Sequence, residues 1–347
     1  MSVSLVQAAK SVSRHIQTRA YSTPRHLMSI ADLTPKEFAR LVLNAAEHKK
    51  AFKAGTTSKE FKGSLSGGPA VAMMFSKRST RTRVSTESAV AMMGGHAMFL
   101  GKDDIQLGVN ESLRDTSTVI SSMTSCIVAR VGPHSDVTGL AEYSSVPVIN
   151  ALSADFHPLQ TIADFLTIHE AFPVTNPSEG SLGLEGRKVA WIGDSNNVLF
   201  DLAIGCFKMG VDIAIASPKG YGLPDRMRSL ILSSGNISKL IETTVPEEAI
   251  KGADILVTDT WVSMGQEEDA KKRLQDFEGF QITHDLAKRG SAKEDWKFMH
   301  CLPRHPEEVS DEVFYDSRSL VFQEAENRLW AAIAALEGFV VNKGNIV

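Results

Sequence analysis

The sequence predicts an α/β protein of two domains, each a parallel sheet flanked by helices, and three observations carry this prediction. Short apolar runs alternate with stretches of helical periodicity along most of the chain, which is typical of a parallel sheet covered on both faces. A polar segment with prolines and a glycine, residues 173–180, interrupts the alternation, which restarts beyond it. The chain has 347 residues, more than one hydrophobic core usually holds.

The first half of the chain is expected to begin with a helix and to hold four strands. Thr34-Pro35 starts the helix, with Thr34 as N-cap, Pro35 at the first position and Glu37 in the first turn. The apolar runs that predict strands lie at 70–75, 97–100, 127–131 and 146–150. The helical patterns between and after them lie at 84–93, 112–124, 136–143 and 158–172.

The second half repeats this architecture with five expected strands. Their apolar runs lie at 188–192, 211–216, 239–243, 254–258 and 297–300. The expected helices lie at 197–209, 224–234, 246–251, 265–275 and 318–338. The two halves therefore resemble each other in architecture, without a short-period repeat.

Composition excludes several classes of protein. The net charge of −4 gives no electrostatic case for nucleic-acid binding. No apolar run approaches the roughly 20 residues that span a bilayer, so we expect no membrane contact. Three widely spaced cysteines, Cys126, Cys206 and Cys301, favour a reducing compartment over a disulfide framework.

The N-terminus differs from the rest of the chain, because residues 1–31 contain no Asp or Glu. Basic residues and many Ser and Thr lie there, and apolar residues share one helical face (Leu5, Ala8, Ala9 and Val12). Such an amphipathic leader predicts a mitochondrial transit peptide over residues 1–24, with a disordered tail as the alternative. We expect cleavage near Tyr21 or a few residues later, and a location in the mitochondrial matrix.

Ligand sites in parallel sheets lie at the carboxyl ends of strands, so the polar residues that follow each apolar run are the candidates. Ser79-Thr80-Arg81-Thr82 follows the strand at 70–75 and opens a helix. Free backbone N–H groups, hydroxyls and the Arg81 guanidinium suit a phosphate dianion there. The alternative is a solvated basic cap, and the Gly-x4-Gly-Lys phosphate loop is absent from the sequence.

Three more candidates follow the other strands of the first half. Arg130 lies at the end of one strand, where an arginine can bind a ligand or cap the surface. His157 precedes Pro158, the favoured first residue of a helix, whose dipole disfavours the imidazolium. We therefore expect a neutral His157 that donates a hydrogen bond to a carbonyl oxygen. Gln160 lies one turn further on; the alternatives are a helix-capping histidine and a solvated glutamine.

The candidates in the second half are amide and carboxyl side chains that follow two of its strands. Asn196-Asn197 follows the strand at 188–192, and the amides can bind a carboxylate or cap the helix. Asp259 follows the strand at 254–258 and precedes Ser263-Met264, an arrangement that suits an ammonium group. A dinucleotide site is not predicted, because Gly-x-Gly-x-x-Gly is missing from this half.

The last candidates are Cys301-Leu302, between two histidines, and Arg328. Cys301 has His300 beside it, but the spacing offers no fourth ligand and no second Cys/His pair, so we expect no metal. Arg328 lies in the last amphipathic stretch and either stays at the surface or reaches back to the cleft.

Together these motifs resemble the aspartate/ornithine carbamoyltransferase family, and within it the mitochondrial members that use ornithine. The resemblance rests on Ser-Thr-Arg-Thr at 79–82, Arg130, His-Pro-Leu-Gln at 157–160, Asp-Thr-Trp-Val-Ser-Met-Gly at 259–265 and His-Cys-Leu-Pro-Arg at 300–304. It extends from about residue 25 to the C-terminus. It implies a carbamoyl-phosphate domain (25–172), an ornithine domain (185–317) and a C-terminal helix (318–347) that packs back on the first domain.

The resemblance also implies residue roles, with no cofactor. The carbamoyl-phosphate ligands would be Ser79, Thr80, Arg81, Thr82, Arg130, His157, Gln160, Cys301, Leu302 and Arg328. Arg130, His157, Cys301 and Arg328 would act in catalysis, and the oxyanion would form facing Arg130, His157 and Thr82. Ornithine would lie on Asn197, Asp259, Ser263 and Met264. A homotrimer is implied, with the loop 101–111 approaching a neighbouring subunit's site.

The rival interpretations differ in what they require of the sequence. Aspartate carbamoyltransferases lack the Ser-Met-Gly loop and the cysteine of His-Cys-Leu-Pro, and putrescine carbamoyltransferases should lack that loop. A nucleotide-binding oxidoreductase would need the missing glycine pattern. An inactive binding or scaffold protein of this fold is a further alternative. The presence of the expected residue at every catalytic position argues against it.

Overall fold

The computed structural model describes residues 23–105, 111–174, 180–235, 237–262 and 269–346. Its first sheet has the order β2-β1-β3-β4, and every neighbouring pair is parallel. The strands are β1 (Val71–Phe75), β2 (Ala97–Leu100), β3 (Cys126–Arg130) and β4 (Val148–Leu152). All four strands predicted for the first half are confirmed, to within two residues at each end.

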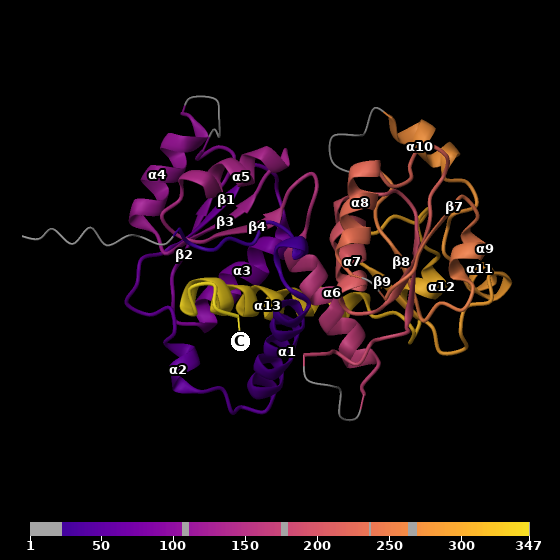
Figure 1. Ribbon diagram of the computed structural model, residues 1–347, viewed down its shortest axis with the longest axis horizontal. Coiled ribbons are helices and arrows are strands. Elements are labelled where there is room, and N and C mark those ends of the chain that lie inside the picture. Colours follow the sequence, from indigo (N-terminus) through magenta and orange to yellow (C-terminus); the bar gives the residue numbers. More distant parts are fainter. Residues whose placement is uncertain (1–22, 106–110, 175–179, 236, 263–268, 347) are drawn as a thin grey trace, which may run out of the picture.

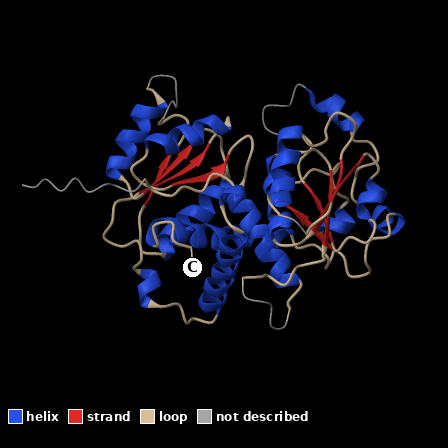
Figure 2. Cartoon of the chain, in the orientation of Figure 1, coloured by secondary structure: helices blue, strands red, loops and turns tan. Residues whose placement is uncertain are grey.

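The second sheet has the order β7-β6-β5-β8-β9 and is also parallel throughout. Its strands are β5 (Lys188–Ile192), β6 (Asp212–Ala216), β7 (Leu240–Thr243), β8 (Ile255–Thr258) and β9 (Lys297–His300). Helices flank each sheet, and the two sheets stand apart with helices between them (Figure 2). The predicted α/β fold class is therefore confirmed.

Most helices of the first half begin at a Ser or Thr whose side chain caps the first turn. Thr34 accepts the backbone N–H of Glu37, and Glu37 accepts the N–H of Thr34, as the capping-box pattern predicts. The helices are α1 (Pro35–Lys53), α2 (Lys59–Lys62), α3 (Thr80–Met92), α4 (Leu113–Met123), α5 (His134–Tyr143) and α6 (Pro158–Ala171), after a 3-10 turn, η1 (Ile30–Asp32). The short α2 was not predicted, because one turn carries too little periodicity.

One helix start in the first half is predicted wrongly. The helix predicted for 84–93 begins four residues earlier, at Thr80. Ser79 is its N-cap, and its Oγ accepts the backbone N–H of Thr82 at 3.3 Å. The polar residues of the phosphate motif therefore form the first helical turn itself, which apolar periodicity does not reveal.

The second half contains α7 (Asn197–Lys208), α8 (Asp225–Ser233), α9 (Pro246–Ile250), α10 (Ala270–Asp276), α11 (His284–Arg289) and α12 (Asp311–Phe314). The short α11 and α12 were not predicted. The helix predicted for 265–275 begins at Ala270, and residues 263–268 lie outside the described ranges. Through the described part of the chain, no helix has the length and apolar character to cross a membrane.

The last helix, α13 (Val321–Leu336), returns to the first half of the chain and continues as a short π-helix, η3 (Glu337–Val341). It packs against α1, α3 and α6, as Figure 1 shows by the yellow helix among the indigo and magenta ones. Trp330 and Ile333 bury their side chains in this contact. The predicted return of the C-terminal helix is confirmed.

Helices α6 and α7 pack against each other where the two halves meet. Phe165 on α6 is fully buried and meets the ring of Phe38 edge-on at 5.0 Å. Gly205 on α7 faces Phe165 so closely that an added Cβ would lie 2.6 Å from the ring. The absence of a side chain at Gly205 therefore sets how closely the two helices approach.

Candidate active site

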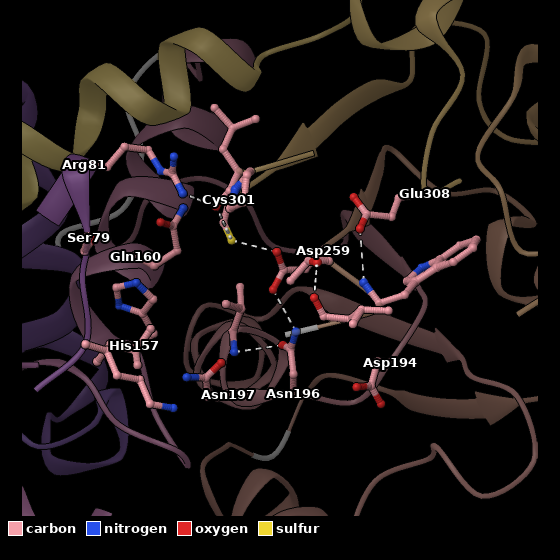
Figure 3. A pocket seen from close by; sticks show the side chains of 18 of the residues that line it. Ser79, Arg81, His157, Gln160, Asp194, Asn196, Asn197, Asp259, Cys301 and Glu308 are labelled. Atoms are coloured by element: carbon pink, nitrogen blue, oxygen red, sulfur yellow. Dashed lines mark hydrogen bonds between the residues drawn. The ribbon is translucent and has the colours of Figure 1, made fainter. Parts of the chain in front are cut away.

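A cavity of about 1030 Å³ lies between the carboxyl ends of the two sheets. Figure 3 shows Ser79, Arg81, His157 and Gln160 on one side of it, and Asn196, Asn197 and Asp259 on the other. It is lined by twelve of the fourteen predicted site residues: Ser79, Thr80, Arg81, Thr82, Arg130, His157, Gln160, Asn197, Asp259, Cys301, Leu302 and Arg328. The other two, Ser263 and Met264, lie outside the described residues.

The topology explains why these residues meet. Each sheet grows outward in both directions from a central pair, β1 with β3 and β5 with β8. The loops after such a pair leave on opposite faces, which opens a crevice at the strand ends. In the second sheet, Gly193 follows β5 with φ 146°, and its Cα lies close enough to β8 that a Cβ would be 3.1 Å from Thr258 Oγ1. A glycine is needed there for both reasons.

The first turn of α3 is a donor-rich end of a helix. Its N–H groups and its partial positive charge point toward the cavity. The Arg81 guanidinium donates to the carbonyl oxygen of Leu302, which lies in the loop after β9 of the second half. A predicted phosphate ligand thus already bridges the two halves of the chain.

Arg328 reaches the cavity from α13, which decides between the two interpretations of this residue. Its Nη2 donates to Thr82 Oγ1 at 3.1 Å, and its Nη1 donates to Gln160 Oε1 at 2.6 Å. Thr82 Oγ1 also accepts the Ser79 hydroxyl at 2.9 Å. Since Thr82 accepts two hydrogen bonds, its own O–H is left to donate into the cavity.

Arg130 and His157 are buried and lie among positive charges. Desolvation, followed by repulsion from Arg328, lowers the pKa of Arg130 to about 10, so it stays charged at neutral pH. Burial first, and then the charges of Arg328, Arg130 and Arg81, hold the pKa of His157 well below its usual value. The neutral imidazole expected from the sequence is thus supported, although desolvation contributes more than the helix dipole considered there.

Six buried side-chain nitrogens have no hydrogen-bond partner within the described ranges, and four of them belong to residues that line the cavity: Arg130 Nε, His157 Nδ1, Trp261 Nε1 and Arg328 Nε. A buried polar atom without a hydrogen bond costs free energy. Polar atoms clustered in this way suit a ligand that supplies the missing hydrogen-bond partners.

On the opposite side of the cavity, the two adjacent asparagines, Asn196 and Asn197, have different contacts. Asn196 is the N-cap of α7, and its Oδ1 accepts the N–H groups of Val198 and Leu199. Its Nδ2 donates to Asp259 at 2.7 Å. The Nδ2 of Asn197 donates to the carbonyl oxygen of Ser153 at 2.6 Å, so it contacts the first half of the chain.

Cys301 occupies the centre of the cavity in Figure 3. Its Sγ lies 2.9 Å from Asp259 Oδ1 and 3.7 Å from the Leu302 carbonyl oxygen. Burial, and then the charge of Asp259, raise the pKa of the thiol well above its usual value. The sulfur is therefore a neutral thiol at physiological pH rather than a nucleophilic thiolate.

His300 and His305, near Cys301 in the sequence, both contact the carboxylate of Glu308. His300 Nδ1 accepts the N–H of Leu302 at 2.9 Å, so its Nε2 carries the proton and donates to Glu308 at 2.9 Å. Glu308 also accepts from His305 and from the N–H of Trp261. Within the described residues, no cluster of His, Cys, Asp or Glu could hold a metal ion.

Sequence reasoning missed several polar residues that support the cavity from behind. Asp164 and Glu324 both accept from the amide of Gln160, and Asp201 accepts the backbone N–H of His157 at 2.8 Å. A signal existed for Asp201, because it is the lone carboxylate of a largely apolar helical stretch, and Asp164 lies between Ala163 and Phe165. A buried carboxylate needs donors nearby, which marks such positions.

The fold and the cavity define a class: a two-substrate transferase in which a cationic site for a phosphate-bearing donor faces an amide and carboxylate site for an amine acceptor. The comparisons with known proteins agree. The aspartate/ornithine carbamoyltransferase carbamoyl-phosphate-binding domain matches residues 25–170, and the Asp/Orn-binding domain of the same family matches residues 185–338. The chain belongs to the aspartate/ornithine carbamoyltransferase family.

Individual relatives extend this result. A mitochondrial ornithine carbamoyltransferase of Emericella nidulans is 66% identical over 357 residues, which cover 99% of both chains. The crystal structure of a mitochondrial ornithine carbamoyltransferase from Coccidioides immitis matches with a TM-score of 0.87 and 65% identity, over 94% of this chain and 100% of that one. The ornithine carbamoyltransferase of Pyrococcus furiosus matches with a TM-score of 0.81 and 40% identity, over 92% of this chain and 98% of that one.

Proposed function

We propose that this chain transfers the carbamoyl group of carbamoyl phosphate to the δ-amine of L-ornithine, giving L-citrulline and phosphate. The observation that carries the proposal is the pairing of sites across one cavity. A helix N-terminus with Arg81 lies on one side, and Asp259 with Asn197 lies on the other. The relatives with this fold are named ornithine carbamoyltransferases. The reaction serves arginine biosynthesis and the urea cycle.

The carbamoyl-phosphate side is proposed to activate the carbonyl carbon. Ser79, Thr80, Arg81 and Thr82 bind the phosphate at the helix N-terminus. Arg130, the neutral His157 and the free O–H of Thr82 donate to the carbonyl oxygen and stabilise its developing negative charge. Gln160 and the Leu302 carbonyl bind the carbamoyl amine. Orientation and charge stabilisation carry the catalysis, without a metal or organic cofactor.

The second substrate is proposed to lie along the opposite wall. Asn197 and the backbone of Met264 bind the α-carboxylate of ornithine, and Asp259 with Ser263 bind its α-ammonium. Cys301 and Arg328 surround the reacting centre. The neutral δ-amine attacks the carbonyl carbon, the bond from that carbon to the phosphate oxygen breaks, and the released phosphate takes the amine proton.

The biological setting follows from the relatives and the leader. Several relatives are named mitochondrial, which places this chain in mitochondria; we propose the matrix as the compartment. Residues 1–24 are proposed as the transit peptide, although residues 1–22 lie outside the described ranges. The proposed domains cover residues 25–172, 185–317 and 318–347. We also propose a homotrimer, in which residues 101–111 approach the active site of a neighbouring subunit.

The test is a competition between acceptors. The purified full chain is incubated with carbamoyl phosphate and equimolar ornithine, aspartate and putrescine, and the carbamoylated products are separated by chromatography. We expect citrulline to dominate. Carbamoyl aspartate or carbamoyl putrescine as the main product would overturn the acceptor assignment and leave the phosphate site standing. No turnover with any acceptor would favour a binding protein of the same fold.

A further inference from the structure

Behind the cavity, two buried carboxyl groups meet at one amide. Asp164 on α6 is 3% exposed, and Glu324 on α13 is 2% exposed. The Nε2 of Gln160 donates to Asp164 Oδ1 at 2.7 Å and to Glu324 Oε1 at 2.8 Å. Since one nitrogen atom bonds to both carboxyl groups, they lie next to each other, and a proton between them would relieve the repulsion of two buried charges.

We propose that Asp164 and Glu324 share one proton, and that this carboxyl pair positions Gln160 and Arg328 while keeping the phosphate site positively charged. The inference rests on the proposed function and deepens it. Asp164 and Glu324 act through other side chains and are positioning residues.

The hydrogen bonds leave room for one proton between the two carboxyl groups. Glu324 accepts an N–H at each oxygen, from Gln160 at Oε1 and from the backbone of His300 at Oε2, 2.9 Å away. Each of these oxygens keeps a second lone pair that can face Asp164, so the proton belongs to the pair and not to one carboxyl group. Asp164 accepts from Gln160 through Oδ1, and its other oxygen can carry the O–H toward Glu324.

The pair continues into the cavity through Gln160. Both N–H groups of this amide are engaged by the carboxyl oxygens, so its Oε1 is turned to Arg328 and accepts Nη1 at 2.6 Å. Arg328 in turn reaches Thr82 at the phosphate helix. Asp164, Glu324 and Gln160 therefore fix the rotamers of side chains that touch the proposed substrate.

The shared proton also affects the net charge near the phosphate site. The titratable groups that interact with the pair include Arg328 on α13, Asp259 after β8, Cys301 after β9 and Cys206 on α7. With one shared proton, the pair carries one negative charge, which Arg328 neutralises, and Arg81 and Arg130 stay free for the phosphate. Loss of that proton would add a negative charge behind an anion site.

Burial supports a pair that keeps this proton at neutral pH. Desolvation is the largest cause of both shifts; it raises the pKa of Asp164 to about 7 and the pKa of Glu324 well above its usual value. Two carboxylates in one buried site cannot both ionise cheaply, and the proton belongs to the pair.

The test compares full-length wild type with Asp164→Asn, Asp164→Ala and Glu324→Gln, and uses Glu326→Gln as control, since Glu326 pairs with Lys53 on the exposed side of the same helix. Asparagine imitates a protonated aspartate and cannot ionise. Calorimetry measures the Kd of inorganic phosphate from pH 7 to 9.5. The ionisation of phosphate affects every protein equally, so the ratio of the wild-type Kd to the variant Kd at each pH reports the protein alone.

We expect wild-type affinity to fall about tenfold relative to Asp164→Asn over this range, as an added unit charge at a partly screened site requires. Turnover at pH 7 should stay within about tenfold of wild type in Asp164→Asn and fall further in Asp164→Ala and Glu324→Gln, because the last two leave a buried N–H unpaired. Glu326→Gln should follow wild type throughout.

Three results would overturn the inference: a constant Kd ratio across the pH range, equal damage in Asp164→Asn and Asp164→Ala, or an Asp164→Asn protein that does not fold. The proposed function is tested separately by the turnover of the wild-type protein with ornithine. Absence of that turnover would contradict the proposed function, whereas the inference about the carboxyl pair is judged on the phosphate Kd values.

Discussion

The thiol of Cys301 lies 2.9 Å from one carboxylate oxygen of Asp259, while the other oxygen accepts the amide of Asn196 at 2.7 Å. These contacts join the loop after β9, the loop after β8 and the N-cap of α7. The Asp259 carboxylate is thereby fixed in direction before a substrate binds. A fixed charge at the end of a strand suits recognition of an ammonium group at a defined position.

Replacement of Asp259 by alanine should impair the use of ornithine far more than the binding of carbamoyl phosphate. The carboxylate lies on the side of the cavity proposed for the acceptor, so the KM for ornithine is expected to rise by two orders of magnitude or more, as for loss of a charged contact. Steady-state kinetics with each substrate varied in turn measure both constants. Equal loss on both sides would contradict the assignment.

The Cys301 thiol should be slow to alkylate at pH 8, because its pKa lies well above the usual value. Desolvation is the larger cause and Asp259 the second, so Asp259→Asn lowers this pKa and should speed alkylation by iodoacetamide several-fold. Mass spectrometry of the Cys301 peptide measures the rate, and Cys301→Ser identifies background labelling at Cys126 and Cys206. An unchanged rate in Asp259→Asn would show that the carboxylate does not influence the thiol.

Arg81→Ala should abolish detectable turnover, with a loss on the order of 10³ or more, while the fold remains intact. Its guanidinium is the charged side chain of α3 that lines the cavity, and it also contacts the Leu302 carbonyl across the cavity. Arg83→Ala is the matched control, since Arg83 lies on the same helix but pairs with Glu87 and covers the ring of Phe99. Robust activity in Arg81→Ala would contradict the phosphate assignment.

Much of this cavity could be predicted from the sequence, because strand ends in parallel sheets converge. Asp259 directly follows one apolar run, Arg130 lies at the end of another, and His157 ends the loop after a third; the structure brings all three to one cavity. Arg328 was left open, since its approach depends on α13 crossing back to the first half of the chain. That crossing is a tertiary arrangement, which periodicity along the chain cannot reveal.

The different contacts of neighbouring polar side chains were harder to predict from the sequence. Asn196 and Asn197 are adjacent and chemically identical, yet one caps α7 and the other contacts Ser153. Which amide faces the cavity depends on where the helix begins, and helix ends are set by local hydrogen bonds. Asp164 and Glu324 lie 160 residues apart in sequence, so their pairing follows only from the packing of α13 on α6.

Asp201 should be necessary for the position of His157. Its Oδ2 accepts the His157 backbone N–H at 2.8 Å, and its Oδ1 accepts from Ser29 Oγ and the N–H of Ile30. Asp201→Asn places an N–H₂ against one of these donors, so kcat is expected to fall about tenfold or more with the fold retained. Circular dichroism checks the fold, and wild-type kcat in Asp201→Asn would contradict this role.

The same carboxyl group should make stability depend on pH. Desolvation raises the pKa of Asp201 to about 7, despite the hydrogen bonds that lower it. A raised pKa in the folded state gives stability that is present below the unfolded value, near pH 4, and is lost as the pH rises through about 7. The difference in unfolding free energy between wild type and Asp201→Asn should therefore be larger at pH 5 than at pH 8, by about 3 kcal/mol. Urea unfolding at the two pH values measures it, and a difference that grows with pH would contradict the sign.

Gly205→Ala should destabilise the contact between the two halves of the chain. An added Cβ would lie 2.6 Å from the ring of Phe165 and 3.1 Å from Thr161 Cγ2, and Phe165 has no room to move because it is fully buried against Phe38. We expect a loss of about 1–3 kcal/mol, as for an overpacked core, since the gain in helix propensity is smaller than this. Gly222→Ala is the control, because its added Cβ meets no atom within 4 Å of the described chain. Thermal unfolding measures both, and an unchanged or raised Tm in Gly205→Ala would show that α6 and α7 can separate without cost.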